Sequence, residues 1–155
     1  MTVPIRKRNR LKDYDYSANG MYFITICTKD RKNILSSITQ SPTTVILTEY
    51  GQIVLDAING IHEYYPNVFV EKYVIMPNHV HLLLSVDSEG GRLLIAPTVS
   101  RVIKQLKSYV TKSVGFPLWQ NSFYDHIIRD ENDFLTKYRY IDTNPANWLD
   151  DEYNI

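Results

Sequence analysis

The sequence predicts an α+β fold in which an antiparallel sheet is covered by helices. Two observations support this class. Stretches rich in β-branched and aromatic residues alternate with segments whose apolar residues recur at helical spacing, in the order β, α, β, β, α, β, α. The second and third strands are separated only by a turn at Pro77-Asn78, and so short a connection joins antiparallel neighbours as a hairpin.

The first half of the chain predicts a strand followed by a helix. Residues 21–28 (MYFITICT) have strand composition and end at a polar stretch. A weak segment containing Ser41-Pro42 follows, and Thr48 can then cap a helix that ends near Pro66. The apolar residues at helical spacing in this helix are Tyr50, Val54, Ala57, Ile58 and Ile61.

The hairpin consists of residues 68–76 and 79–86, two apolar runs of strand length. Residues 87–100 predict a loop because of their glycine and proline content. Thr98 or Ser100 then caps a second helix, which continues to residue 114.

The last two elements are a strand at residues 122–129 and a helix at residues 131–144, capped by Asp130 and stopped by Pro145. The first six elements together are the ferredoxin-like split βαβ arrangement, an antiparallel sheet with two helices on one face. The third helix is additional. We expect it to lie across the other face and to bring Tyr140 there.

Composition favours one domain over residues 1–155, because 44% hydrophobic and 22% charged residues can form a core without disulfides. The single cysteine, Cys27, lies in an apolar run and is expected to be a core residue. No apolar run approaches the roughly 20 residues that span a bilayer, and the N-terminus lacks the apolar stretch of a signal peptide. These features predict a soluble, cytoplasmic protein that makes no membrane contact.

The net charge is zero, but the charges are segregated. A basic N-terminal arm (residues 1–20) contrasts with a short acidic tail (residues 146–155). A second basic set lies on the polar face of the second helix. The candidate phosphate-binding residues in these two sets are Arg6, Lys7, Arg8, Arg10, Arg101, Lys104 and Lys107. Such residues contact nucleic-acid phosphates in some proteins and are merely solvated in others.

The stretch YVIMPNHVHLLL places two histidines at the start of the third strand. His79 and His81 share one face because successive strand residues alternate, and they face away from Val80. If the apolar residues lie beneath the two sheet-covering helices, the histidines point to the opposite face. There, Tyr140 and Asn144, one turn apart on the third helix, would meet them. The alternative is a pair of half-buried strand histidines without chemistry.

Five motifs in order make the chain similar to a known family: DYDYSANGMYFITICTKDR, LTEYGQIV, YVIMPNHVHLLL, LWQNSFYDHIIRDENDF and YRYIDTNP. A His-hydrophobic-His strand followed by a helical tyrosine, with a polar residue four places on, resembles the HUH single-tyrosine transposases. The nearer resemblance is to the REP-associated tyrosine transposases. It implies that His79, His81 and Asn144 bind a divalent metal, Mg²⁺ or Mn²⁺, and that Tyr140 is the nucleophile.

The implied activity is a metal-dependent cleavage and rejoining of single-stranded DNA near hairpins, through a 5′-phosphotyrosine intermediate. Neutral imidazoles and an amide oxygen suit this task because they add no negative charge to repel DNA. The partner would be single-stranded DNA with a hairpin, and the protein would be a monomer or a homodimer. Two alternatives remain: a catalytically silent nucleic-acid-binding module, and a metal hydrolase that uses an activated water.

Two other residues near these motifs need an interpretation. Tyr138 is a rival nucleophile, but it lies two residues from Tyr140 and points elsewhere around the helix. We expect it to pack with Phe134 and Ile141. His126, in YDHIIR, has no chemical role that the sequence assigns.

Overall fold

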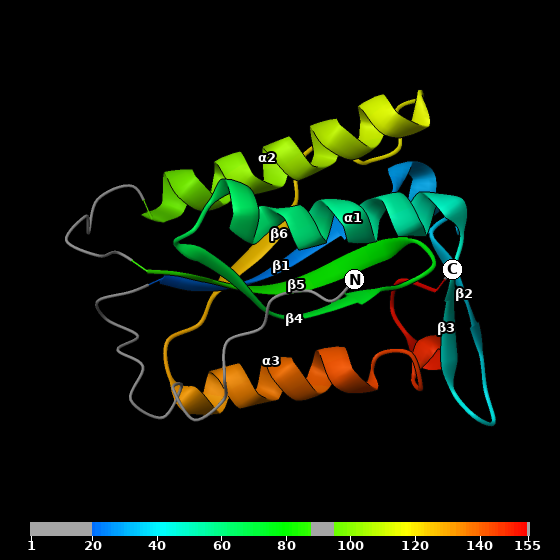
Figure 1. Cartoon of the computed structure of the whole chain (residues 1–155). Coiled ribbons are helices and arrows are strands. Elements are labelled where there is room, and N and C mark those ends of the chain that lie inside the picture. The colour runs from blue at the N-terminus through cyan, green and yellow to red at the C-terminus, as the bar shows by residue number, and fades with distance from the viewer. Residues whose placement is uncertain (1–19, 88–94, 155) are drawn as a thin grey trace.

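The structure, a computed structural model, describes residues 20–87 and 95–154. Figure 1 shows three layers: a sheet in the middle, two helices on one face and one helix on the other. The sheet is antiparallel and four-stranded, in the order β4-β5-β1-β6. Its strands are β1 (Gly20–Cys27), β4 (Val68–Ile75), β5 (His79–Val86) and β6 (Tyr124–Ile127). The helices are α1 (Glu49–Tyr64), α2 (Ile95–Val114) and α3 (Glu131–Thr143). This confirms the predicted ferredoxin-like arrangement with an additional helix.

The register of the central strands positions the histidines. β5 pairs with β1 along its whole length, with His79 opposite Cys27 and His81 opposite Thr25. Alternation along β5 places Val80 and Leu82 on the side of α1 and α2, and the histidines on the side of α3, as predicted.

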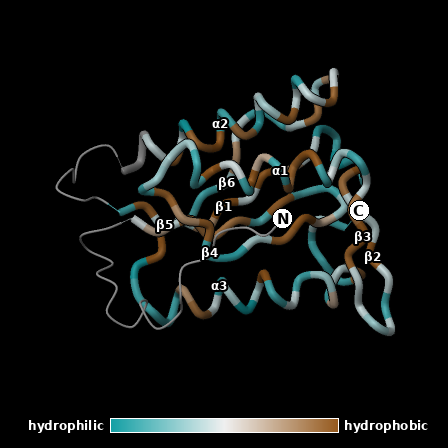
Figure 2. Tube along the Cα trace, in the orientation of Figure 1, coloured by the Kyte–Doolittle hydropathy of each residue, from teal (hydrophilic) through white to brown (hydrophobic). Residues whose placement is uncertain are grey.

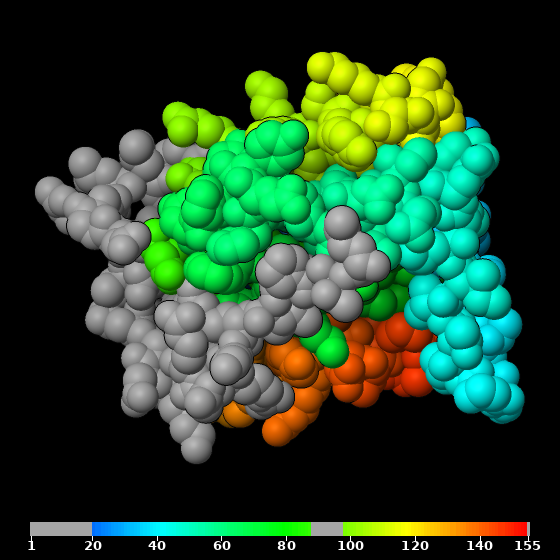
Figure 3. Space-filling view, in the orientation of Figure 1, coloured from blue at the N-terminus to red at the C-terminus, as the bar shows by residue number. Residues whose placement is uncertain are grey.

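Two apolar cores lie on the two faces of the sheet, and Figure 2 shows hydrophobic residues concentrated along the strands. The larger core joins the sheet to α1 and α2 through aliphatic residues such as Ile24 and Leu84. The smaller one joins the sheet to α3 through Phe134 and Ile141. In the space-filling view, α1 and α2 form one side of the molecule and α3 the opposite side (Figure 3). The site on the α3 side is therefore separate from the main core.

Helix α1 begins as the sequence predicts, with the hydroxyl of Thr48 accepting from the backbone N–H of Gly51 at 3.1 Å. Position 51 requires a glycine because the helix lies close to the backbone of Leu35, and a Cβ at this position would overlap the Leu35 carbonyl oxygen. Gly60, in the same helix, has only the Tyr64 ring near it, at 3.9 Å. The glycine in the motif LTEYGQIV thus has a packing reason.

Gly51→Ala is expected to lower the free energy of unfolding by about 1–3 kcal/mol, because the added methyl group forces helix and backbone apart. Gly60→Ala is the matched control and should raise it by about 0.5–1 kcal/mol, since alanine favours helix and has space here. Urea unfolding of both variants measures the difference. Equal effects of the two substitutions would contradict the close approach.

Several boundaries differ from the predicted ones. Residues around Ser41-Pro42 form a second, two-stranded sheet of β2 (Ser36–Thr39) and β3 (Thr44–Leu47), which is short and largely exposed and therefore carries a weak apolar pattern. Helix α2 begins at Ile95, inside the predicted loop. Pro97 does not prevent this, because the first turn of a helix tolerates a proline. Cys27 is half-buried at the end of β1 and is not part of the core. None of the described helices is both long and apolar enough to span a membrane.

Candidate active site

The two histidines at the start of β5 are buried, with 0% and 1% of their surfaces exposed, and their ring centroids lie 4.6 Å apart. The Nδ1 atom of His79 donates to the side-chain oxygen of Asn78 at 2.8 Å. The Nδ1 atom of His81 lies 2.9 Å from the hydroxyl of Thr25. The Nε2 atoms of both rings have no hydrogen-bond partner among the described residues.

The amide of Asn78 fixes the tautomer of His79. Its NH₂ group donates to the backbone oxygen of Tyr153 at 2.7 Å, so its oxygen must face His79. Because this oxygen can only accept, the proton of His79 sits on Nδ1 and Nε2 keeps its lone pair. A histidine that is held in this way is prepared to bind a metal ion through Nε2.

Helix α3 brings Tyr140 and Asn144 to the histidines. Asp130 caps its start, as predicted, and Phe134 and Ile141 bury its apolar side against the sheet. The ring of Tyr140 lies 5.2 Å from that of His81 and is 36% exposed. Asn144 is 2% exposed, and its side-chain oxygen has no partner among the described residues. The four residues that the sequence singled out are therefore neighbours.

Burial controls the charge state of the histidines. Desolvation lowers the pKa of His79 to about 3, with the Asn144 side chain opposing this shift and the charge of Arg31 adding to it. Desolvation, followed by the neighbouring His79, lowers the pKa of His81 well below its usual value. Both imidazoles are thus neutral at pH 7, which is the state that binds metals.

Acid is expected to destabilise the metal-free protein below pH 6.5. The unfolded chain binds protons at both histidines from about pH 6.5 downward, whereas folded His79 binds one only near pH 3. Stability should therefore fall as the pH falls, by up to about 1.4 kcal/mol per pH unit for each histidine. Urea unfolding with a chelator between pH 6.5 and 5 measures this slope. The double variant His79→Asn/His81→Asn should have a flatter slope, and an unchanged slope would refute the assignment.

The phenol of Tyr140 is not activated by the protein alone. Burial raises its pKa, Asp151 raises it further, the Asn144 side chain lowers it, and Glu152 raises it again. The hydroxyl is therefore protonated at neutral pH. A nucleophilic role requires additional positive charge near its oxygen.

The residues present fit a divalent metal ion. Two buried Nε2 atoms and one buried amide oxygen lack partners in the described structure, and buried polar atoms are normally paired. Among the described residues, no group of three or more His, Cys, Asp or Glu side chains could hold a metal. Asn144 would therefore have to complete the set with His79 and His81.

The end of the chain contributes residues that the sequence analysis missed. The ring of Tyr153 lies 4.4 Å from that of His79, and burial raises the pKa of this phenol to about 12. Trp148 lies 6.1 Å from the same histidine. The available signal was the presence of two aromatic residues in the acidic tail. The tail covers the site, so the histidine face is not open.

Two cations lie over rings of the site. The guanidinium of Arg31 lies 4.9 Å from the centre of the Tyr153 ring. The ammonium of Lys137 lies 5.4 Å from the centre of the Phe23 ring, which stacks on His81 at 5.1 Å. Both distances suit cation–π contacts.

The predicted basic residues lie elsewhere. Arg101 and Lys104 are exposed on α2, across the sheet from the histidines. Lys107 donates to the backbone oxygens of Gln120 and Ser122 at 2.8 and 2.9 Å, so its charge stabilises the chain after α2. Four further candidates lie outside the described residues: Arg6, Lys7, Arg8 and Arg10.

His126 of β6 and Tyr138 of α3 both make contacts that stabilise the fold. His126 pairs with Asp133 at 2.8 Å and ties β6 to the first turn of α3. Tyr138 packs on Phe134 at 5.7 Å, as predicted.

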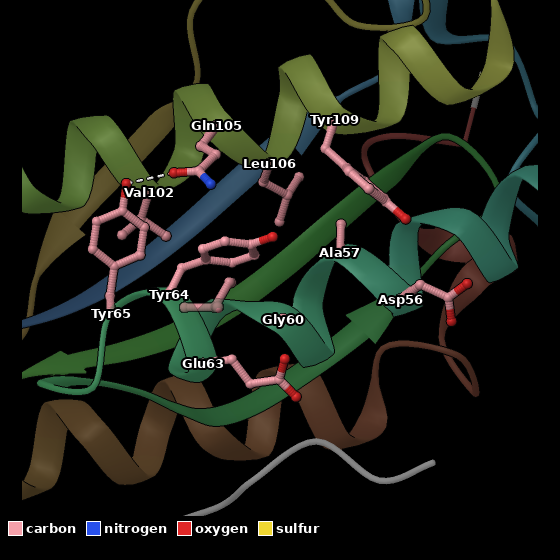
Figure 4. Close-up of a pocket in the computed structure, with 11 residues that line it drawn as sticks. Asp56, Ala57, Gly60, Glu63, Tyr64, Tyr65, Val102, Gln105, Leu106 and Tyr109 are labelled. Carbon is pink, nitrogen blue, oxygen red and sulfur yellow. Dashed lines mark hydrogen bonds between the residues drawn. The ribbon is translucent and has the colours of Figure 1, made fainter.

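A groove between α1 and α2 lies across the sheet from the histidines (Figure 4). The hydroxyl of Tyr65 donates to the Gln105 side chain there, at 2.6 Å. Its lining includes Asp56 and Glu63 but no histidine. This groove therefore lies apart from the histidines, Tyr140 and Asn144.

The known proteins that this chain resembles in sequence or in fold include transposases. No family model matches the chain. An uncharacterised protein of Haemophilus influenzae is 31% identical over 97% of this chain and 93% of its own length. A second H. influenzae protein, named "Putative REP-associated tyrosine transposase", is 29% identical over 85% of this chain and 73% of its own length.

A solved transposase structure has a similar fold. The structure of a REP-associated tyrosine transposase bound to a REP hairpin superimposes with a TM-score of 0.64, at 22% identity over 83% of this chain and 68% of that chain. In sequence and in fold, the chain is thus similar to REP-associated tyrosine transposases.

Proposed function

We propose that the protein is a metal-dependent single-stranded DNA endonuclease and strand transferase, which cuts and rejoins DNA near hairpins through a 5′-phosphotyrosine at Tyr140. One observation supports this most directly. The Nε2 atoms of His79 and His81 and the side-chain oxygen of Asn144 have no partner within residues 20–87 and 95–154, and His81 lies beside the Tyr140 ring. Unpaired polar atoms in such a place are explained by a ligand that binds to them.

The ligand that fits is Mg²⁺ or Mn²⁺, held by His79, His81 and Asn144. When bound, it would polarise a nonbridging phosphate oxygen and stabilise the departing 3′ oxygen. The three protein ligands are neutral, so the charge of the cation is retained for the phosphate. The hydrogen bonds of Asn78 and Thr25 to the two Nδ1 atoms orient the rings for this purpose.

Tyr140 would attack the phosphorus through its phenolic oxygen. The bond from phosphorus to the 3′ oxygen breaks, the phenolic proton is lost, and the departing oxygen ends as a hydroxyl. Contact with the edge of the Phe23 ring, at 6.0 Å, and the docking of α3 limit the positions of the phenol. The phosphotyrosine conserves the energy of the broken ester, so a 3′ hydroxyl can attack it and rejoin the strand.

A hairpin substrate is proposed because the related solved transposase is bound to a REP hairpin. Arg101 and Lys104 are candidate contacts for a duplex stem, since they are exposed and project from one helix. Lys107 is a weaker candidate because its ammonium already binds two carbonyls.

The decisive experiment is incubation of the wild-type protein with a pool of single-stranded hairpin DNAs and Mg²⁺ or Mn²⁺. We expect cut strands and a covalent protein–DNA adduct, both lost on chelation. Binding without cutting would instead support a silent nucleic-acid-binding module. Cutting without any adduct would support a hydrolase, although no described carboxylate is held with the histidines to activate a water.

A further inference from the structure

One side of helix α3 carries four polar residues at helical spacing: Asp133, Lys137, Tyr140 and Asn144. The first binds His126 of β6, the third contacts His81 of β5, and the fourth is a proposed metal ligand. β1 lies between β6 and β5 in the sheet. Lys137 meets this strand, because its ammonium lies 5.4 Å from the centre of the Phe23 ring. The row of polar residues thus crosses the sheet, with Lys137 next to the proposed nucleophile.

The ring of Phe23 connects Lys137 to the groups of the candidate active site. It stacks on His81 at 5.1 Å and contacts Tyr140 at 6.0 Å, while His81 and Tyr140 lie 5.2 Å apart. The three ring centres thus form a nearly equilateral triangle, and the ammonium lies over one of its corners. A lysine ammonium ends a flexible four-carbon stem. Rotation of this stem can bring it to a phosphate that is held between His81 and Tyr140.

The charge of Lys137 has no acidic partner in the described chain. Asp133, one turn earlier in α3, is the residue that would ordinarily pair with it, but its carboxylate binds His126 at 2.8 Å. No carboxylate of residues 20–87 and 95–154 is within ion-pair distance of the ammonium. The side chain is half-buried. Lys137 is thus a partly desolvated cation without a counterion, which suits it to bind an anion.

A phosphate that enters this site meets negative charge. Burial raises the pKa of the Tyr140 phenol, and the carboxylates of Asp151 and Glu152 raise it further, so both carboxylates act on the place where the phosphate must lie. A phosphodiester is itself an anion, and its nonbridging oxygens require positive charge around them during phosphoryl transfer. Lys137 is a cation next to Tyr140 in the row and can supply this charge.

We propose that the ammonium of Lys137 binds a nonbridging oxygen of the scissile phosphate. This rests on the proposed transesterification at Tyr140. In that reaction the bond from the phenolic oxygen to phosphorus forms while the bond from phosphorus to the 3′ oxygen breaks, and Lys137 neither gives nor takes a proton. Its charge stabilises the negative charge of the transition state.

The test combines neutral substitutions of the lysine with a neutral phosphate. A hairpin oligonucleotide that the wild type cuts is prepared with a methylphosphonate at the scissile position, as each of its two diastereomers. Binding is measured in the Tyr140→Phe background and cutting in the Tyr140 background, for the wild type, Lys137→Met and Lys72→Met. Lys72 is the matched control, because it also lies over a ring, that of Tyr138 in α3, but has Asp142 as its counterion at 2.9 Å.

For the normal phosphodiester, Lys137→Met should slow cutting about 100-fold and weaken binding about tenfold or less, because the contact is strongest in the transition state. Lys72→Met should leave both largely intact, and Lys137→Arg, which keeps the charge, should slow cutting less than Lys137→Met. One methylphosphonate diastereomer lacks the oxygen that Lys137 binds. With it, Lys137→Met and the wild type should bind and cut equally, as in a double-mutant cycle, whereas with the other diastereomer the difference should remain.

Two results would overturn the proposal. One is equal cutting of the normal phosphodiester by Lys137→Met and the wild type. The other is a deficit of Lys137→Met that is the same for the normal phosphate and for both diastereomers, since this indicates a structural effect. If no protein cuts a methylphosphonate, the binding measurements decide by the same comparison.

If Lys137→Met does not fold, Lys137→Gln is the second neutral variant and is judged by the same criteria. Failure of the wild type to cut any hairpin would refute the transesterase function as well. Cutting with an adduct, but without coupling between Lys137 and the scissile phosphate, refutes the role of Lys137 alone.

Discussion

Tyr140→Phe is expected to abolish strand cleavage and the covalent adduct while the protein stays folded. The substitution removes only the phenolic oxygen, which is the proposed nucleophile, and keeps the ring that contacts His81 and Phe23. Cleavage should fall by roughly 10⁴-fold or more, as for loss of other essential nucleophiles. The free energy of unfolding should change by less than about 0.5 kcal/mol, because the residue is 36% exposed. Gel assays of cut DNA and urea unfolding measure the two effects.

Tyr138→Phe is the control, because this residue of the same helix packs on Phe134 and lies under the ammonium of Lys72. It should leave cleavage and adduct formation largely intact. The wild-type adduct should carry DNA through its 5′ phosphate, and peptide mapping should locate it within residues 140–148. Persistence of cutting and of the adduct in Tyr140→Phe would show that another residue is the nucleophile.

Replacing His79 and His81 by alanine is expected to abolish both metal binding and cleavage. The two Nε2 atoms are the proposed metal ligands, and Asn144 alone cannot retain the ion. Calorimetric titration with Mn²⁺ measures binding. His62→Ala is the control, since this histidine of α1 donates from Nδ1 to the backbone oxygen of Val68 at 2.8 Å, outside the site. Equal Mn²⁺ binding by the double variant and the wild type would refute the ligand assignment.

The double variant should also lose stability, by about 2–4 kcal/mol. In the structure α3 and the tail bury the pair, so alanine leaves a cavity and deprives Asn78 of its hydrogen bond. Activity must therefore be compared at temperatures where urea unfolding shows both proteins to be folded.

The main elements of the fold follow from local patterns in the sequence. Thr48 and Asp130 mark helix starts because their side chains cap backbone N–H groups, and both caps are present. The β2–β3 hairpin could not be predicted, because its strands are four residues long and half-exposed, so they lack strong alternation. The sequence predicts too late a start for α2 because proline is a loop signal in a sequence, whereas the first turn of a helix also accepts it.

The residues of the candidate site were predictable where two elements each carry a periodic pattern. Strand alternation placed His79 with His81, and helical spacing placed Tyr140 with Asn144. Arg31 and Tyr153 could not be found in this way. Their positions depend on two left-handed residues in one turn and on the path of the chain after Pro145, and neither follows a regular period.

The layered arrangement predicts the order in which backbone amide protons exchange with solvent. β1 and β5 are the two inner strands, paired on both edges and covered on both faces, so their amide protons should exchange with solvent only on global unfolding. Helix α3 is held by the smaller core and by two polar contacts, Asp133 with His126 and Asp142 with Lys72, and we expect it to undock without separating these strands. Its amide protons should exchange sooner. The histidines thus stand on the slowest-exchanging part of the protein, while the phenol stands on a part that can move relative to them.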